Sequence, residues 1–162
     1  RETGCGGCND GTAGRKEVVP TMLRHKETQD NLNDEYKVKD IIMNKWKVKL
    51  HKLPIQYKLD YALTRFDKSI LAFCEIKVRT NSIGSYPTYI VSLAKILSGR
   101  NLARETNTKS FLIVKWSDSL GFIDMENDFK TIVGGRIDRN DWQDIEPMCE
   151  FNINNFQRIY NE

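Results

Sequence analysis

The chain has 162 residues, of which 40% are hydrophobic and 29% are charged, and its formal net charge is +3. These values predict an ordinary globular protein with one hydrophobic core. They exclude the dense cysteine framework of a small secreted protein, because only four cysteines occur, and no apolar run approaches the roughly 20 residues that cross a bilayer.

Residues 1–27 are polar and rich in glycine, so we expect a flexible arm followed by a single domain over residues 28–162. Cys5 and Cys8 in this arm have the spacing of half a zinc site. No second cysteine pair or histidine pair completes that site, which favours a glycine-rich tail over zinc binding. No secretion signal opens the sequence, and we expect an intracellular protein with no membrane partner.

Hydrophobic periodicity divides the sequence after the arm into helices and strands. Pro87 fits the first turn of the second helix, whose apolar face includes Ile90 and Leu97. A turn at residues 67–69 joins two of the strands into a hairpin. In chain order, the expected elements are a helix over 30–46, strands over 47–53, 55–66 and 70–79, a helix over 87–105, and strands over 109–116, 121–125, 131–133 and 149–153, with a break at Gly134–Gly135.

This order of elements predicts an α/β (α+β) fold in which a central mixed β-sheet is flanked by helices. The strand over 109–116 follows a helix, so we expect it to pair parallel to an earlier strand.

Seven lysines lie between residues 37 and 58, against one aspartate. One interpretation is a solvated lysine-rich face. The other is a track that holds a phosphate backbone. With one lysine of the second helix added, the candidate nucleic-acid-binding residues are Lys45, Lys47, Lys49, Lys52, Lys58 and Lys95.

Glu75 lies in the most apolar run of the sequence, where a charge costs free energy unless something compensates it. With a two-residue turn in the hairpin, Asp60 lies directly opposite Glu75 on one face of the sheet, and Lys77 projects from that same face. A four-residue turn keeps this grouping, whereas a three-residue turn breaks it unless a bulge intervenes. Two facing carboxylates repel each other, but they suit the oxygen-rich shell of Mg²⁺ or Mn²⁺.

Asp60 on one arm of a hairpin, with Glu75, Ile76 and Lys77 on the other, resembles the motif of the PD-(D/E)xK nuclease superfamily. The resemblance implies a restriction-endonuclease-like core over about residues 30–116, in the order helix, three strands, helix, strand. It also implies that Asp60, Glu75 and the carbonyl of Ile76 bind Mg²⁺ or Mn²⁺, and that Lys77 positions the attacking water.

Other features of the family match the sequence less closely. Many members carry a glutamate on the first helix that binds the metal, and Glu35 is the corresponding residue here. Some members place a polar residue on the helix after the motif, for which Tyr86, Ser92 and Lys95 are candidates. Leu59 stands where the family name has proline.

The resemblance implies a metal-dependent nuclease that hydrolyses DNA, of phage or mobile-element origin. It leaves open whether the enzyme is an endonuclease or an exonuclease, and whether it forms a homodimer. Two alternatives are a non-catalytic nucleic-acid-binding module on the same fold, and a structural or protein-interaction domain in which Asp60, Glu75 and Lys77 form an ion network.

Overall fold

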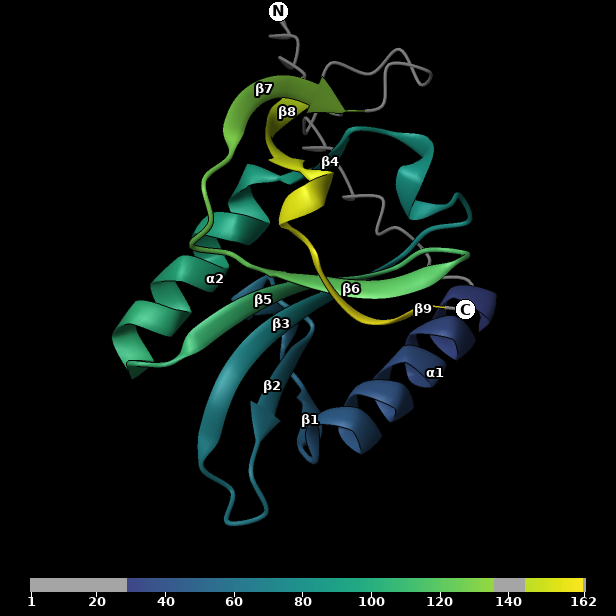
Figure 1. The fold of residues 1–162 in the computed structure, drawn as a ribbon. Coiled ribbons are helices and arrows are strands. Elements are labelled where there is room, and N and C mark those ends of the chain that lie inside the picture. Colours follow the sequence, from purple (N-terminus) through teal and green to yellow (C-terminus); the bar gives the residue numbers. More distant parts are fainter. Residues whose placement is uncertain (1–28, 136–144, 162) are drawn as a thin grey trace, which may run out of the picture.

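A computed structural model describes residues 29–135 and 145–161 (Figure 1), so the predicted arm lies outside the described residues. A six-stranded mixed sheet and a three-stranded sheet are packed with two α-helices, which confirms the predicted fold class. The helices and strands are α1 (Gln29–Trp46), β1 (Lys49–Lys52), β2 (Tyr61–Thr64), β3 (Ile70–Val78), β4 (Thr88–Ser92), α2 (Leu93–Thr106), β5 (Lys109–Lys115), β6 (Ser119–Asp124), β7 (Lys130–Gly135), β8 (Ile145–Asn152) and β9 (Gln157–Asn161).

The larger sheet has the strand order β1-β2-β3-β5-β6-β9, and the smaller one has the order β4-β8-β7. In the larger sheet, β3 and β5 are parallel neighbours joined through α2, and the other neighbouring strands run antiparallel. The predicted parallel pairing of the strand after the second helix is therefore confirmed. The two parallel strands occupy the centre of the sheet, where backbone and side chains are farthest from water.

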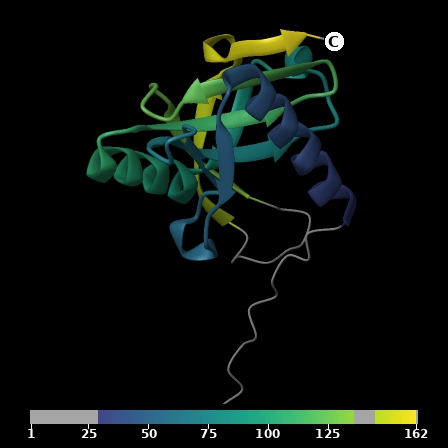
Figure 2. The ribbon, with the colours of Figure 1, turned by 90° about the horizontal axis from the view of Figure 1, so that it is seen from below.

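The two helices lie on opposite sides of the larger sheet (Figures 1 and 2). Side chains alternate between the faces of β3, so Cys74 joins the hydrophobic cluster beneath α1, and Phe73 joins the cluster beneath α2. Ile42 of α1 and Ile96 of α2 are both fully buried in these clusters. Residues 73, 75 and 77 of β3 therefore face α2.

The hairpin has a different shape from the predicted one. Residues 55–57 form a 3₁₀-helix rather than the start of a strand, and Ile55 is 84% exposed. Pro54 precedes this turn, and Lys58 ends it with a φ of 57°, so the chain cannot stay extended there. Strand β2 consequently begins only at Tyr61, immediately after Asp60.

The predicted two-residue turn is also wrong, but a bulge restores the predicted pairing. The Arg65 N–H donates to the Ser69 carbonyl at 3.0 Å, which leaves a three-residue loop in which Lys68 has a φ of 68°. The strand register then shifts by one residue between Leu63 and Thr64, so that Tyr61 pairs with Cys74. Asp60 and Glu75 therefore occupy opposed positions on the two arms.

The second helix starts later than predicted. Residues 88–92 form β4, in which Tyr89 and Val91 are buried and Ile90 is 42% exposed. This two-residue alternation is that of a strand, and β4 pairs antiparallel with β8. Helix α2 begins only at Leu93, and its most deeply buried residues are Ile96, Gly99 and Ala103 rather than the predicted apolar face.

One further expectation near the C-terminal end of the described residues was wrong. The predicted break at Gly134–Gly135 is part of β7, which continues through both glycines. Strand β9, which is not among the predicted elements, pairs with β6 at the edge of the larger sheet. Across residues 29–135 and 145–161, no helix has the length and apolar character needed to cross a membrane.

We expect Gly99→Val to lower the free energy of unfolding by about 1–3 kcal/mol, because a Cβ atom at this position meets the Met125 sulfur and the Ser110 side chain beneath α2. Gly84→Val is the matched control, since a Cβ atom at Gly84 meets nothing within 4 Å. Urea unfolding of both variants measures the effect. Equal stability of the two variants would contradict this close packing.

Candidate active site

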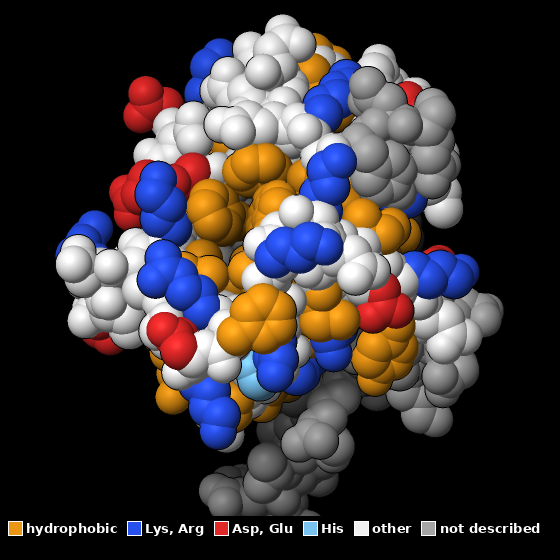
Figure 3. All heavy atoms as spheres, turned by 60° about the horizontal axis from the view of Figure 1, so that its bottom comes forward, with side chains coloured by type: hydrophobic (Ala, Val, Ile, Leu, Met, Phe, Trp, Pro, Cys, Tyr) orange, Lys and Arg blue, Asp and Glu red, His pale blue; other side chains and the backbone are white. Residues whose placement is uncertain are grey.

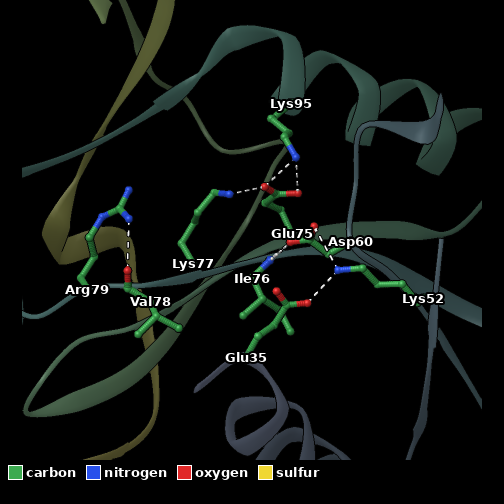
Figure 4. Close-up of polar contacts among 9 residues, drawn as sticks. All are labelled: Glu35, Lys52, Asp60, Glu75, Ile76, Lys77, Val78, Arg79 and Lys95. Atoms are coloured by element: carbon green, nitrogen blue, oxygen red, sulfur yellow. Dashed lines mark hydrogen bonds and ion pairs between the residues drawn. The ribbon is translucent and has the colours of Figure 1, made fainter. Parts of the chain in front are cut away.

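Glu75 has a completely buried side chain on the face of β3 that packs against α2. Its Oε1 lies 2.6 Å from Lys77 Nζ and 2.8 Å from Lys95 Nζ, and Lys95 also donates a hydrogen bond of 2.9 Å to Oε2 (Figure 4). Both ammonium groups are therefore within ion-pair distance of the same buried oxygen, Oε1.

The groups around Glu75 change the pKa of its carboxyl. Burial raises the pKa of Glu75 above the ordinary value of 4.5, and the Lys77 and Lys95 ammonium groups partly oppose that effect. The charge of Asp60 raises the pKa of Glu75 further. The two opposed carboxylates therefore interact electrostatically across the hairpin.

Asp60 immediately precedes β2, beside the part of β3 that β2 does not cover. Its backbone N–H donates to the Cys74 carbonyl at 3.1 Å, and its Oδ2 accepts a hydrogen bond of 2.8 Å from the Ile76 N–H. The N–H and C=O of one strand residue point toward the same neighbour, so the Ile76 carbonyl also faces this open edge. The predicted residues Asp60, Glu75, Ile76 and Lys77 are thus brought together.

Glu35 of α1 lies on the other side of Asp60. Lys52 Nζ is 2.8 Å from Glu35 Oε1 and 3.7 Å from Asp60 Oδ1, so one ammonium group lies between the two carboxylates (Figure 4). The Tyr61 side chain is hydrogen-bonded to Glu35, and burial followed by this contact raises the pKa of Tyr61. Within the described part of the chain, no three Asp, Glu, His or Cys side chains converge closely enough to hold a metal ion by themselves.

The donor atoms at this site nevertheless fit a divalent cation. Lys95 Nζ lies within 3 Å of both Glu75 oxygens and so stands in for a cation on that carboxylate. Mg²⁺ needs only one or two carboxylates, since water and substrate phosphates complete its shell. Asp60, Glu75 and the Ile76 carbonyl supply hard oxygen ligands of this kind. The side chains of Lys52 and Lys95 are 49% and 32% exposed, and their long stems allow them to move aside.

The predicted nucleic-acid-binding lysines divide into two groups. Lys52 and Lys95 contact carboxylates of the site, a role that charge patterning in the sequence does not indicate. The other four are exposed on or near β1, and Figure 3 shows basic side chains interspersed with hydrophobic ones on this face. This exposed group consists of Lys45, Lys47, Lys49 and Lys58.

Of the three polar candidates on or near the second helix, only Lys95 reaches Glu75. Ser92 instead donates a hydrogen bond of 2.9 Å to Glu146, and Tyr86 is 66% exposed beyond the end of β3. The sequence signal that could have selected Lys95 is its place near the start of a helix that crosses over β3.

Comparison with known proteins identifies the chain's relatives. No curated protein matches the sequence. Among solved structures, the chain is similar to Hjc, a Holliday junction resolvase of Archaeoglobus fulgidus, with 11% identity and a TM-score of 0.47 over 74% of this chain and 84% of that one. A family model described as "Phage putative PDDEXK endonuclease" matches residues 21–159. Because this match spans most of the sequence, the protein belongs to this family of PDDEXK nucleases, as the hairpin motif predicted.

Proposed function

We propose that the protein is a divalent-cation-dependent deoxyribonuclease whose reaction centre is formed by Asp60, Glu75 and Lys77. The observation that best supports this proposal is the fully buried carboxylate of Glu75, which lies opposite Asp60 and contacts two ammonium groups. A buried ion cluster contributes little net stability, because desolvation offsets the attraction between its charges. Catalysis therefore accounts for this cluster better than a purely structural role, and the family supports a nuclease.

In this proposal, Asp60, Glu75 and the Ile76 carbonyl hold Mg²⁺ or Mn²⁺. When bound, the cation stabilises negative charge on the phosphate and makes water a stronger nucleophile. Lys77, which is about one-third exposed at the surface of the cluster, orients the attacking water. In the absence of the cation, Lys95 holds the Glu75 carboxylate in position. With a cation on that carboxylate, Lys95 and Lys52 can contact substrate phosphate.

DNA is the proposed substrate, held through its phosphates by the exposed lysines near β1. Glu35 acts at the rim of the site through Lys52 and Tyr61 rather than as a third carboxylate on the same ion. Contacts between lysines and phosphates are electrostatic and independent of base sequence, so the affinity for DNA should fall as salt concentration rises.

Glu75→Gln and Lys77→Ala should each reduce cleavage of plasmid or linear DNA in Mg²⁺ or Mn²⁺ by about 100-fold or more, because each removes a group of the reaction centre. DNA binding measured in EDTA should change little. Lys109→Ala is the matched control, since Lys109 forms a surface ion pair with Asp124 at 3.3 Å. Wild-type activity in both site variants, or no metal-dependent cleavage by the wild type, would refute the proposed function.

Divalent cations should stabilise the folded wild type and not the Glu75→Gln variant, because the cation binds the folded site only. At a cation concentration of about 100 times Kd, the gain in unfolding free energy is about 2.7 kcal/mol. Thermal unfolding with and without Mg²⁺ or Mn²⁺, in the absence of DNA, measures the effect. Equal stabilisation of both proteins would place cation binding elsewhere.

The stability difference between the wild type and Glu75→Gln should depend on pH in a defined direction. The raised pKa of Glu75 means that the folded state holds its proton more tightly than the unfolded state does. The wild type therefore loses stability relative to the variant as pH rises from about 4.5 through the raised pKa, and the difference is constant above that interval. Urea unfolding between pH 4 and 8 tests this, and a difference that moves the other way contradicts it.

A further inference from the structure

A separate pocket of about 330 Å³ lies beyond the end of β3, between that end and β4. Its volume is in the range of small-ligand sites, about 300–1,000 Å³. Two tyrosines, a tryptophan and a proline supply flat apolar walls, and an arginine and an asparagine supply polar groups. The residues on which the argument rests are Arg79, Asn81, Tyr86, Pro87, Tyr89 and Trp116.

The pocket continues the row of charged side chains on β3. The Arg79 N–H donates to the Lys115 carbonyl at 2.7 Å, which extends the β3–β5 ladder by one residue. Arg79 therefore projects from the same face as Glu75 and Lys77. Four residues of strand separate Arg79 from Glu75 by about 13 Å, which is within a few nucleotides of a phosphodiester held at the site.

Two tyrosines give the pocket an aromatic lining. Tyr86 is 66% exposed, whereas Tyr89 is only 6% exposed. The Tyr89 hydroxyl is inaccessible, so this residue lines the pocket through its ring.

Arg79 adds a positive charge at the same place. Its guanidinium lies 5.4 Å from the centre of the Tyr89 ring and donates one hydrogen bond of 3.1 Å to the Val78 carbonyl. A guanidinium has five N–H donors, so others remain for a phosphate. Burial raises the pKa of the Tyr89 hydroxyl to about 12; the positive charge of Arg79 opposes this rise and the negative charge of Glu75 adds to it.

We propose that this pocket binds one unpaired nucleoside of single-stranded DNA beside the scissile bond. The base stacks on Tyr86, and Arg79 contacts a flanking phosphate. This assignment rests on the proposed nuclease function and narrows the substrate to DNA with an unpaired or frayed strand.

The chemistry of the lining favours this ligand. A nucleobase has two apolar faces, which match the flat aromatic walls of the pocket. Bases inside a continuous duplex are stacked and paired, and they enter a pocket only after unstacking. Stacking accepts any base, so the pocket selects for single-stranded character rather than for sequence.

The test uses a single-stranded oligonucleotide containing 2-aminopurine and a blunt duplex of equal length, both in EDTA so that cleavage is absent. Tyr86→Ala should weaken binding of the single strand about 10-fold and abolish the quenching of 2-aminopurine fluorescence, with little change for the duplex. Phe66→Ala is the matched control, because Phe66 is 73% exposed at the hairpin tip, at the opposite end of β3.

Unchanged single-strand affinity in Tyr86→Ala, an equal loss for the duplex, or the same loss in Phe66→Ala would overturn the assignment. Its failure is distinguishable from failure of the proposed function. If the wild type cleaves DNA with a divalent metal but Tyr86→Ala does not weaken single-strand binding, the role of the pocket is rejected and the nuclease function stands. If Tyr86→Ala loses single-strand binding and quenching but the wild type shows no metal-dependent cleavage, the role of the pocket is supported and the nuclease function is rejected.

Discussion

A carboxylate with no solvent exposure at the centre of a β-sheet is the constraint on which the rest of this structure depends. Glu75 lies on β3, whose neighbours on the two sides are β2 and β5, and α2 covers its face. Water cannot solvate its charge, so the compensation must come from protein groups or a bound cation. Lys77 supplies one part from the same strand, and Lys95 supplies another from α2. The position of α2 is therefore coupled to the electrostatics of the strand beneath it.

The second carboxylate depends on a different feature, the late start of β2. Because β2 starts at Tyr61, the edge of β3 beyond Cys74 has no strand partner, and the Asp60 side chain bonds the Ile76 N–H in place of a backbone carbonyl. A longer β2 would cover this edge with backbone and leave no room for the carboxylate. The 3₁₀ turn that replaces the expected strand is thus a condition for the site rather than an irregularity beside it.

Long periodic elements could be predicted from the sequence, and elements that depend on distant partners could not. Helix α1 and strands β3 and β5 carry strong patterns of their own, and the motif on β3 was sufficient to indicate the family. The start of α2 was misplaced because Tyr89 and Val91 are held extended by β8, which lies far away in the sequence. The Asp60–Glu75 opposition was predicted correctly through an incorrect turn, since the bulge near Leu63 offsets the extra loop residue. The contact of Lys52 with Glu35 joins α1 to β1, and no local pattern indicates it.

The pairing of β4 with β8 has a consequence for the order in which the protein is made. Residues 29–115 contain both carboxylates and both lysines that contact Glu75, but β4, from which α2 starts, finds its partner only when residues 145–152 have been translated. During translation, β4 therefore has no strand partner to hold the start of α2 until synthesis is well advanced. The cover that α2 places over Glu75 is therefore completed only after most of the chain has been translated.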